Sequence, residues 1–241
     1  MRNGVVLQAI ILAGGKGTRL RPFTTNFPKP LVPIGDVPIL EIVLRQLKFA
    51  GITKVTLAVN HLAELIMAFF GNGEKLGLDI KYSIEDKVLG TAGPLSLIKD
   101  LDDDFIVMNG DLLTTIDFSD FFRKHLDSEA VATIATFTRE VKIDLGVLKT
   151  DNDAFVDYIE KPVYTFDVSM GIYVLNRSVI ESIPQETKFD MPDLILKLHR
   201  NKKLVRCYRG TYRWLDIGRL DDFEEANELF EKNRKEFLPD E

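Results

Sequence analysis

The sequence predicts a single α/β domain in which a mainly parallel sheet is flanked by helices. Two observations lead to this fold class. Buried-strand patterns alternate with helical patterns through the first half of the chain, and 241 residues with 45% hydrophobic content are enough to bury one substantial core. Ligands of such sheets bind at the carboxyl ends of the strands, so functional residues are expected in the loops that follow them.

Residues 1–130 show this alternation most clearly. Short apolar runs predict buried strands, and apolar residues at helical spacing predict the helices between them. Pro38 suits the first turn of one helix and Gly51 ends it, while Gly71-Asn72-Gly73 ends the next helix. In order, the predicted elements are strand 8–12, helix 37–50, strand 55–59, helix 63–70, strand 78–84, helix 91–99, strand 105–108 and helix 118–125.

Residues 131–241 contain more predicted strands and fewer helices, so this half is expected to shape an acceptor pocket. The strands are 131–137, 146–149, 155–159, 170–175 and 204–208, and the helices are 190–200 and 220–233. The charged tail that ends at Glu241 predicts a solvated terminus. No internal repeat, low-complexity segment or linker divides the sequence, so residues 1–241 are expected to form one domain.

The composition argues against several classes of protein. A net charge of −6 argues against a general nucleic-acid or acidic-membrane binder, whose surface would be basic. The single cysteine, Cys207, rules out an intramolecular disulfide and a thiolate metal cluster, and it is expected to be a small buried hydrophobe. The apolar run from Val5 to Leu12 is broken by Gln8, and no run of about 18 apolar residues exists. A cytoplasmic protein without nucleic-acid or membrane partners is expected.

The stretch after the first predicted strand combines glycines with positive charges. Gly14, Gly15 and Gly17 let the backbone turn sharply and expose its N–H groups. Four cationic side chains follow within a short distance, and no acidic residue precedes Asp36. These cations are Lys16, Arg19, Arg21 and Lys29. Such a loop can hold an anion, and a phosphate chain is the expected ligand.

Two common phosphate-binding loops do not fit this stretch. A Walker loop requires G-x-x-x-x-G-K-[ST], but Lys16 is followed by Gly17. A dinucleotide fingerprint begun at Gly15 meets Leu20 where its third glycine should stand. For the glycines alone, an ordinary turn after a strand remains an equal alternative, and the cations argue against that alternative.

The sequence L-A-G-G-K-G-T-R-L-R-P, followed by P-K-P-L-V-P-I from Pro28, resembles the signature of the sugar-1-phosphate nucleotidyltransferases, also called NDP-sugar pyrophosphorylases. The resemblance implies a Rossmann-like, GT-A-like nucleotidyltransferase fold. It also implies that Arg19 and Lys29 are catalytic, Arg19 by neutralising the triphosphate and Lys29 by holding the reacting phosphates. The loop residues it assigns to the nucleotide are Leu12, Ala13, Gly14, Gly15, Gly17, Thr18 and Arg19. The hexapeptide repeats of the β-helix domain that many members carry are missing, so no such domain is expected.

A second cluster follows the predicted strand 78–84 and resembles the family's L-G-T-A-G motif. Gly90 and Thr91 are expected to present N–H groups at a helix N-terminus, and Glu85 stands where a family residue reads the nucleobase. A carboxylate only accepts hydrogen bonds, and guanine offers two adjacent donors, whereas uracil and thymine offer one donor between two carbonyls. Glu85 therefore favours GTP, although a solvated carboxylate at a strand end is the alternative. The thymidylyl branch also usually has Lys-Gln where this chain has Lys29-Pro30, and both features resemble the short mannose- or heptose-1-phosphate guanylyltransferase-like members.

Two aspartates are candidates for binding magnesium. Asp111 follows the predicted strand 105–108, and Asp216 lies in W-L-D-I-G before the last helix. Mg²⁺ takes hard oxygen ligands and usually only one or two carboxylates, with phosphate and water completing its shell. By spacing alone, each aspartate is more often a turn or capping residue. The resemblance assigns both as metal ligands.

The Glu160-Lys161-Pro162 segment resembles the family's sugar site. The resemblance implies that Glu160 binds sugar hydroxyls and Lys161 binds the sugar phosphate, and Gly146 and Ser169 are assigned to the same pocket. A surface ion pair beside a proline turn is the alternative. Ser169 and Met170 replace the Asn and Ala common in the family, which leaves the sugar open.

The implied reaction is attack by a sugar-1-phosphate oxygen on the α-phosphorus of a nucleoside triphosphate, with pyrophosphate leaving. The catalytic task is to align two polyanions and neutralise their charge, so His61, His125 and His199 are not needed as general bases and are expected on helices or their edges. Uridylyl, thymidylyl or cytidylyl specificity is one alternative, and a non-catalytic nucleotide or sugar-phosphate sensor is another. A homo-oligomer is compatible with the sequence, which does not identify the pathway.

Overall fold

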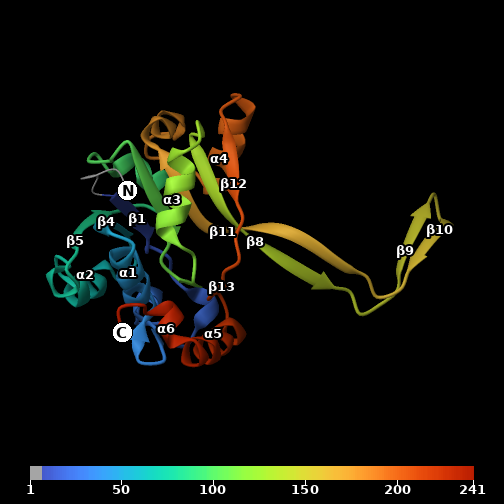
Figure 1. The fold of residues 1–241 in the computed structure, drawn as a ribbon, viewed down its shortest axis with the longest axis horizontal. Coiled ribbons are helices and arrows are strands. Elements are labelled where there is room, and N and C mark those ends of the chain that lie inside the picture. The colour runs from blue at the N-terminus through green and yellow to red at the C-terminus, as the bar shows by residue number, and fades with distance from the viewer. Residues whose placement is uncertain (1–6) are drawn as a thin grey trace.

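A computed structural model describes residues 7–241 as an α/β body from which a long two-stranded arm projects (Figure 1). A seven-stranded sheet with the order β12-β8-β11-β6-β1-β4-β5 runs through the body. The predicted α/β fold, with a mixed and mainly parallel sheet flanked by helices, is confirmed. Residues 1–6, which include the start of the apolar run from Val5, lie outside the described part of the chain.

Six strands of the central sheet share one direction. Strands β1 (Leu7–Leu12), β4 (Ile52–Val59), β5 (Asp79–Ile84) and β6 (Asp104–Asn109) pair in parallel. Strands β8 (Ala132–Lys142) and β12 (Val205–Tyr208) also pair in parallel. Between these groups lies β11 (Val163–Asn176), which is antiparallel to both β6 and β8. The carboxyl ends of the parallel strands therefore meet at one edge.

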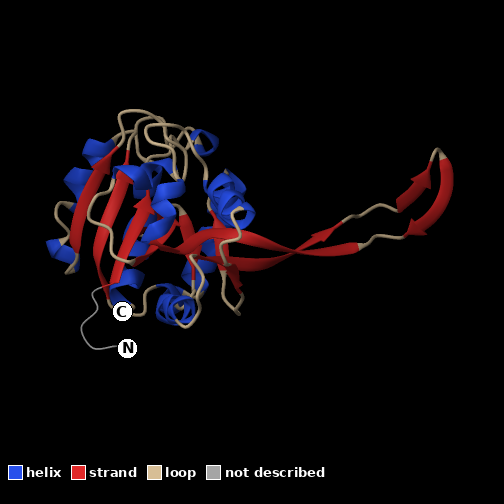
Figure 2. Cartoon of the chain, turned by 90° about the horizontal axis from the view of Figure 1, so that it is seen from above, coloured by secondary structure: helices blue, strands red, loops and turns tan. Residues whose placement is uncertain are grey.

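Alternating residues along the strands face two separate cores, which is why helices cover both faces of the sheet (Figure 2). Ile11 and Ile106 pack with helices α1 (Ile39–Phe49), α2 (Ala63–Phe70) and α3 (Phe118–Leu126). Ile10 and Val107 pack on the other face with α4 (Met191–Arg200). No helix within residues 7–241 has both the length and the apolar character needed to cross a membrane.

A third core joins the C-terminal helices to the start of the chain. It combines α5 (Leu220–Lys232) and α6 (Arg234–Phe237) with the short strands β2 (Pro33–Ile34) and β3 (Val37–Pro38). Two further short strands, β7 (Leu112–Thr114) and β13 (Trp214–Asp216), pair antiparallel beside the sheet. Neither pair was predicted, because two or three residues carry no periodic signal.

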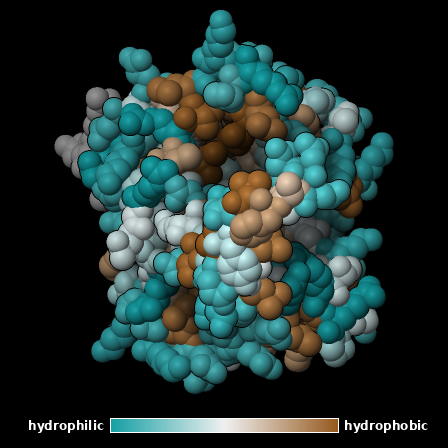
Figure 3. Space-filling model, turned by 90° about the vertical axis from the view of Figure 1, so that its right-hand side faces the viewer, coloured by the Kyte–Doolittle hydropathy of each residue, from teal (hydrophilic) through white to brown (hydrophobic). Residues whose placement is uncertain are grey.

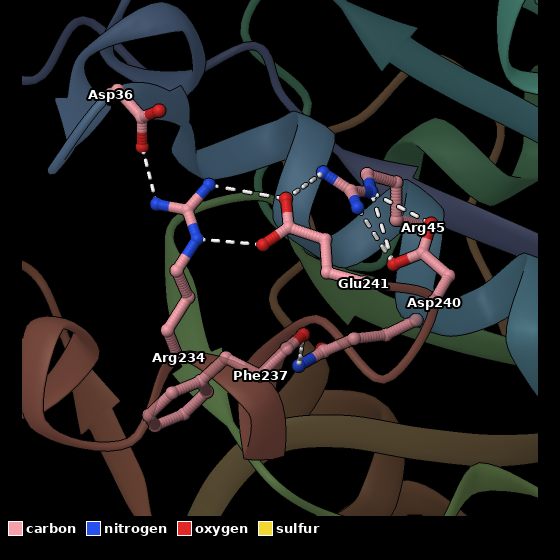
Figure 4. Close-up of polar contacts among 7 residues, drawn as sticks. Asp36, Arg45, Arg234, Phe237, Asp240 and Glu241 are labelled. Atoms are coloured by element: carbon pink, nitrogen blue, oxygen red, sulfur yellow. Dashed lines mark hydrogen bonds and ion pairs between the residues drawn. The ribbon is translucent and has the colours of Figure 1, made fainter.

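The C-terminal tail, predicted to be solvated or frayed, has exposed charged residues but is packed against the body by its apolar residues. Phe237 is fully buried, and its carbonyl accepts a hydrogen bond of 2.9 Å from Gln46 Nε2. Arg45 forms ion pairs with Asp240 and Glu241, and the side chains that fix this end of the chain are drawn in Figure 4. Arg234 also pairs with Glu241 and with Asp36. Three of the tail's charged residues, Arg234, Asp240 and Glu241, form these pairs, and the apolar residues between them are packed.

The helix predicted over 91–99 is also wrong. Only Gly93–Leu97 form a short 3-10 helix, and Ile98 is extended. Pro94 lacks an N–H group, and Gly93 lies so close to its neighbours that a Cβ there would meet Leu89 Cβ at 2.8 Å. Cys207 is exposed rather than buried, because β12 is an edge strand of the sheet. The other predicted helices are present within two residues of their predicted ends.

The arm comprises residues 138–168. Strands β8 and β11 continue past the body and stay paired from Thr138–Asp167 to Lys142–Val163. At the tip, β9 (Val147–Asp151) and β10 (Ala154–Ile159) form a separate hairpin (Figures 1 and 2). The strands predicted over 146–149 and 155–159 are therefore confirmed, and those predicted over 131–137 and 170–175 continue well beyond the body.

Candidate active site

Two neighbouring cavities lie at the carboxyl edge of the sheet. The first has a volume of about 360 Å³ and the second about 260 Å³. Both are lined by Leu12 at the end of β1, Asn109 at the end of β6, and Thr91. The first is lined mainly by residues of the glycine loop and the segment after β5, and the second mainly by β11, the start of α4 and β13. Two ligands can therefore lie side by side at this edge.

The glycine loop forms one wall of the first cavity. Leu12, Ala13, Gly14 and Gly15 line it. The loop bends at Gly17, whose φ of +58° is in the left-handed region, and its carbonyl accepts a 2.6 Å hydrogen bond from the hydroxyl of Thr24. The predicted nucleotide residues Gly17, at this bend, and Thr18 and Arg19, beyond it, do not line the cavity.

Glu85 follows β5 and lines the first cavity with a side chain that is only 8% exposed. Its Oε2 accepts a 3.1 Å hydrogen bond from the Leu89 N–H. A methyl group on Gly14 would lie 3.2 Å from its Oε1, so the glycine lets the carboxylate approach the loop. Asn60 Nδ2 donates to the Glu85 carbonyl at 2.7 Å and was missed from the sequence, because nothing marks an asparagine after a strand. The alternative of a solvated carboxylate does not hold.

Burial raises the pKa of Glu85 above its usual value of 4.5, and the hydrogen bond from Leu89 partly offsets this effect. The folded chain then holds the proton more tightly than the unfolded chain, so the free energy of unfolding falls as pH rises from about 4.5 through the raised pKa. We expect Glu85→Gln to gain stability relative to the parent between pH 4 and pH 7, as measured by urea midpoints. The exposed Glu64→Gln change should show no such gain, and a relative loss in Glu85→Gln would contradict the assignment.

Gly90 and Thr91 line the first cavity, but the N–H of Thr91 is not free as expected. The Thr91 N–H donates to Asp190 Oδ1 at 3.1 Å, and Thr91 Oγ1 accepts from the Met191 N–H at 2.7 Å. Gly90 has a φ of +81°, and a Cβ there would lie 2.5 Å from Asp190 Oδ1. This turn is therefore attached to the start of α4, and it leads into a short 3-10 helix and not into the predicted α-helix.

The pairing of β7 with β13 brings the two candidate metal ligands together. Leu112 lies opposite Asp216, and the Ile217 N–H donates to the Asp111 carbonyl at 3.2 Å. Burial raises the pKa of Asp216, and the carboxylate of Asp111 raises it further. Lys29 and Arg19 act in the opposite direction, so both predicted catalytic cations lie within electrostatic reach of Asp216.

Lys29 lies at the centre of this group. Its side chain forms an ion pair with Asp111, and the residue is only 7% exposed. Arg19 approaches from the glycine loop, with its Nη1 3.3 Å from where a Cβ on Gly218 would lie. Lys29 and Asp111 both line the first cavity, whereas Asp216 lines the second. The charged group therefore stands where the two cavities meet.

The donor set at this junction fits Mg²⁺. Within residues 7–241 no cluster of three or more His, Cys, Asp or Glu side chains forms a metal cage. Asp111 and Asp216 supply two carboxylates, which is the number that magnesium usually takes from a protein when phosphates and water complete its shell. The pair is thus suited to a metal that arrives with a phosphate ligand.

The second cavity is shaped by the body end of β11. Ser169, Met170, Gly171 and Tyr173 line it, and the hydroxyls of Ser169 and Tyr173 lie 2.9 Å apart. A Cβ on Gly171 would lie 2.6 Å from Asn109 Nδ2, so the glycine lets β11 approach the end of β6. Trp214 Nε1 donates to the Met170 carbonyl at 3.1 Å. Asn109 and Trp214 were not predicted as site residues. Each stands two positions before one of the two aspartates, and this adjacency is the signal that could have identified them.

Three of the four residues predicted for the sugar phosphate do not meet these cavities within the same chain. Gly146 lies between β8 and β9, and Glu160 and Lys161 lie between β10 and β11, where the arm joins its tip. Gly146 is covered by Tyr158, whose hydroxyl oxygen would lie 2.0 Å from a Cβ there. Ser169 alone of the four lines the second cavity. The family resemblance assigned all four residues to one pocket, and within one chain only Ser169 lines it.

Comparison with known proteins gives a consistent match. A family model described as nucleotidyl transferase matches residues 8–233. A UTP–glucose-1-phosphate uridylyltransferase of Synechocystis sp. is 35% identical over 241 residues, which cover 91% of this chain and 62% of that protein. A mannose-1-phosphate guanyltransferase of Debaryomyces hansenii is 34% identical, covering 93% of this chain and 64% of that protein. This chain thus spans less than two thirds of the length of these curated relatives.

A solved structure matches over almost its whole length. HddC from Yersinia pseudotuberculosis, crystallised as a complex with GMP-PN, aligns with a TM-score of 0.69 and 27% identity. The alignment covers 93% of this chain and 99% of that chain.

Proposed function

Because this chain belongs to the nucleotidyl transferase family, we propose that it transfers a nucleotidyl group from a nucleoside triphosphate to a sugar-1-phosphate. The observation that supports this reaction best is the charged group at the junction of the two cavities, formed by Lys29, Asp111, Asp216 and Arg19. One oxygen of the sugar phosphate attacks the α-phosphorus, a new P–O bond forms, and the bond to the β-phosphate bridging oxygen breaks. The products are an NDP-sugar and pyrophosphate.

Each half of the chain takes one substrate in this proposal. Residues 1–130 supply the glycine loop, Glu85, Gly90 and Thr91 and hold the triphosphate in the first cavity. Residues 131–241 supply Ser169 and the wall of the second cavity, which receives the sugar. An oxygen of a sugar phosphate is already an adequate nucleophile, so the main task is in-line alignment of two polyanions.

The cations have distinct roles in the proposed step. Arg19 neutralises the triphosphate, and Lys29 stabilises the charge that develops on the reacting phosphates. Asp111 and Asp216 would hold Mg²⁺, which, when bound, offsets further phosphate charge. No covalent intermediate and no histidine base are needed. His125 is held on α3 by Thr133 Oγ1 at 2.7 Å and Asp104 Oδ1 at 3.2 Å, and His199 lies on α4.

We assign GTP as the favoured nucleotide. Glu85 is buried in the first cavity and can accept hydrogen bonds from both N1–H and the 2-amino group of guanine. The complex of HddC with GMP-PN supports a guanine nucleotide, while the Synechocystis uridylyltransferase supports UTP. Uridylyl, thymidylyl or cytidylyl transfer is therefore the alternative on the same scaffold. A sensor without catalysis is the alternative of another class.

The test combines each of the four common NTPs and dTTP with a panel of sugar-1-phosphates and magnesium, and measures pyrophosphate release. We expect GTP to give a kcat/KM about 10-fold or more above UTP. Glu85→Gln should lower that GTP preference by about 10- to 100-fold, because the amide presents one acceptor and places a donor against guanine. The matched Glu64→Gln change should leave the preference unaltered.

Other outcomes distinguish the alternatives. A clear preference for UTP or dTTP in the parent would refute the role of Glu85, and nucleotide binding without pyrophosphate release for any pair would favour the sensor. Glu160 as a ligand of sugar hydroxyls, Lys161 as a ligand of the sugar phosphate, and Gly146 remain predictions. The cytoplasmic location is also part of this proposal, which leaves the identity of the sugar open.

A further inference from the structure

The arm has one apolar face and one polar face. Directly paired residues point to the same side of an antiparallel ribbon, so Val141 shares a face with Tyr164, and Arg139 with Phe166. The pair Phe137 and Val168 continues this face into the body. The opposite face carries the pairs Thr138–Asp167, Glu140–Thr165 and Lys142–Val163. This period of two is the pattern of a strand pair that is covered on one side.

Nothing in residues 7–241 covers the apolar face of the arm. Phe166 is 53% exposed and Phe155, at the tip, is 66% exposed. Tyr164 and Tyr158 are exposed as well, and almost half of the large apolar side chains exposed in the described chain belong to the arm. An isolated two-stranded ribbon is only marginally stable in water, and its open edges favour further pairing. A partner surface that covers the apolar face would therefore stabilise the arm.

The second cavity lacks a group that its proposed ligand needs. Asp216 is the single charged side chain among the described residues that line it, so the cavity wall itself supplies no cation, and Lys29 lines the first cavity instead. A phosphate dianion in a protein site is normally met by Arg, Lys or several N–H donors. Lys161 is a candidate cation, but along an extended strand it lies roughly 25 Å from Ser169 at the cavity wall. The cavity of the same chain is out of its reach.

We propose that the arm of one copy of this chain docks against a second copy and brings Lys161 and Glu160 to the second cavity of that copy. Two copies related by a two-fold axis do this reciprocally, so each site is built from both chains. This inference rests on the proposed function for the identity of the ligand, a sugar-1-phosphate. The arm's apolar face is then covered by the partner, and the phosphate gains its cation.

The position of the arm supports a second copy as the occupant. Strand β8 is parallel to the strands that carry the site, so its carboxyl end leads into the arm from the same edge at which the cavities lie. Figure 3 views the molecule from the side to which the arm points, and this side is hollowed and shows hydrophobic residues around the hollow. The arm and its target therefore lie on one side of the molecule, as reciprocal docking requires.

The exposed rings of the arm supply a substantial apolar area. The exposed parts of Phe155, Tyr158, Tyr164 and Phe166 amount to roughly 400 Å² per arm if each ring side chain offers about 200 Å². Two arms would bury about 800 Å² through these rings alone, which is about half of a standard protein interface.

A first experiment measures association without reference to activity. Sedimentation equilibrium of the full chain should show a dimer, and Phe166→Ser should raise the dimer dissociation constant by about 10-fold or more. Thr165→Ser, on the opposite face of the same strand, should leave it unchanged. Because Phe166 is exposed in the single chain, thermal unfolding of the dissociated Phe166→Ser body should match that of the parent at low concentration. A monomeric parent, or equal effects of the two changes, would overturn the proposal.

A second experiment locates Lys161, again without an assay of turnover. In a Cys207→Ser background, chains with Lys161→Cys are mixed with chains that carry Ser169→Cys and treated with a short bifunctional thiol reagent. Covalent pairs of the two different chains are expected, and a body-surface control, Lys75→Cys in place of Lys161→Cys, should give none. Cross-linking within one chain that carries both cysteines, without mixed pairs, would show that the arm folds back on its own body.

The third experiment tests whether the site is shared. Lys161→Ala and Asp111→Asn chains, each with little activity alone, are mixed and allowed to exchange subunits. Random assembly makes half of the dimers mixed, and each mixed dimer regains one intact site, so about a quarter of the parent activity should return. No recovery from exchanged chains would exclude a shared site. If the parent itself has no activity while the first two experiments succeed, the proposed reaction fails and the docking stands.

Discussion

Replacing Asp111 or Asp216 by alanine is expected to reduce kcat by about 1,000-fold while the fold is retained. Both carboxylates stand where the two cavities meet, and they are the oxygen ligands available there for a magnesium ion that arrives with phosphate. Losing either one leaves the metal with too few fixed ligands to keep the phosphates in line. The measurement is pyrophosphate release at saturating substrates and a series of magnesium concentrations.

The stability of the Asp216→Ala variant can be predicted from the pKa of Asp216. The pKa of Asp216 is raised by desolvation and by the neighbouring Asp111, but its side chain is open to solvent, so its charge is held at only a small cost in the folded chain. Asp216→Ala should therefore keep or increase the thermal stability of the parent, which is a common result when a functional residue is removed. Asp221→Asn, an exposed change in α5, serves as the control and should alter neither property. Full turnover in Asp111→Ala or Asp216→Ala would refute the metal assignment.

Lys29→Met is expected to lower kcat by about 100- to 1,000-fold. The ammonium group is almost fully buried and is paired with Asp111, so it is held in place before any phosphate arrives. Its charge should act more strongly on the transition state than on the bound substrates, because it lies at the junction where the new bond forms. KM for the nucleotide should therefore change less than kcat, as measured by steady-state kinetics at fixed magnesium.

Two further variants serve as controls for Lys29→Met. Lys29→Arg keeps the charge but should not restore activity, since a residue that is 7% exposed leaves little space for the larger guanidinium group. Lys75→Met removes an exposed lysine far from the cavities and should behave as the parent. Equal losses in Lys29→Met and Lys75→Met would show that overall charge, and not position, is responsible.

The sequence predicted which residues meet at the carboxyl edge of the sheet, because its signals there are local. The glycine loop, Glu85 and Asp111 each follow a strand of the parallel sheet, and such strands bring their carboxyl ends together. Asp216 could be assigned only through a family resemblance. Its place beside Asp111 depends on the pairing of β7 with β13, and strands of three residues leave no periodic pattern to read.

The arm is a part of the structure whose position could not be predicted from sequence patterns. Its alternation of apolar and polar residues is that of any half-buried strand, and this pattern does not tell which surface covers the apolar side. The predicted strands were therefore present, but Gly146, Glu160 and Lys161 were separated from the cavity. The C-terminal tail is the opposite case, since its charges predicted solvation while Arg45 and Arg234 hold it against the body.

Strand β11 passes without a break from the wall of the second cavity into the arm. The strand contacts the rest of the site at Gly171, where β11 meets Asn109 at the end of β6. A small rotation at this point is amplified at the tip, and whatever restrains the tip also restrains the wall. By thermodynamic linkage, a ligand that orders the wall strengthens capture of the tip by the same factor by which capture of the tip strengthens ligand binding.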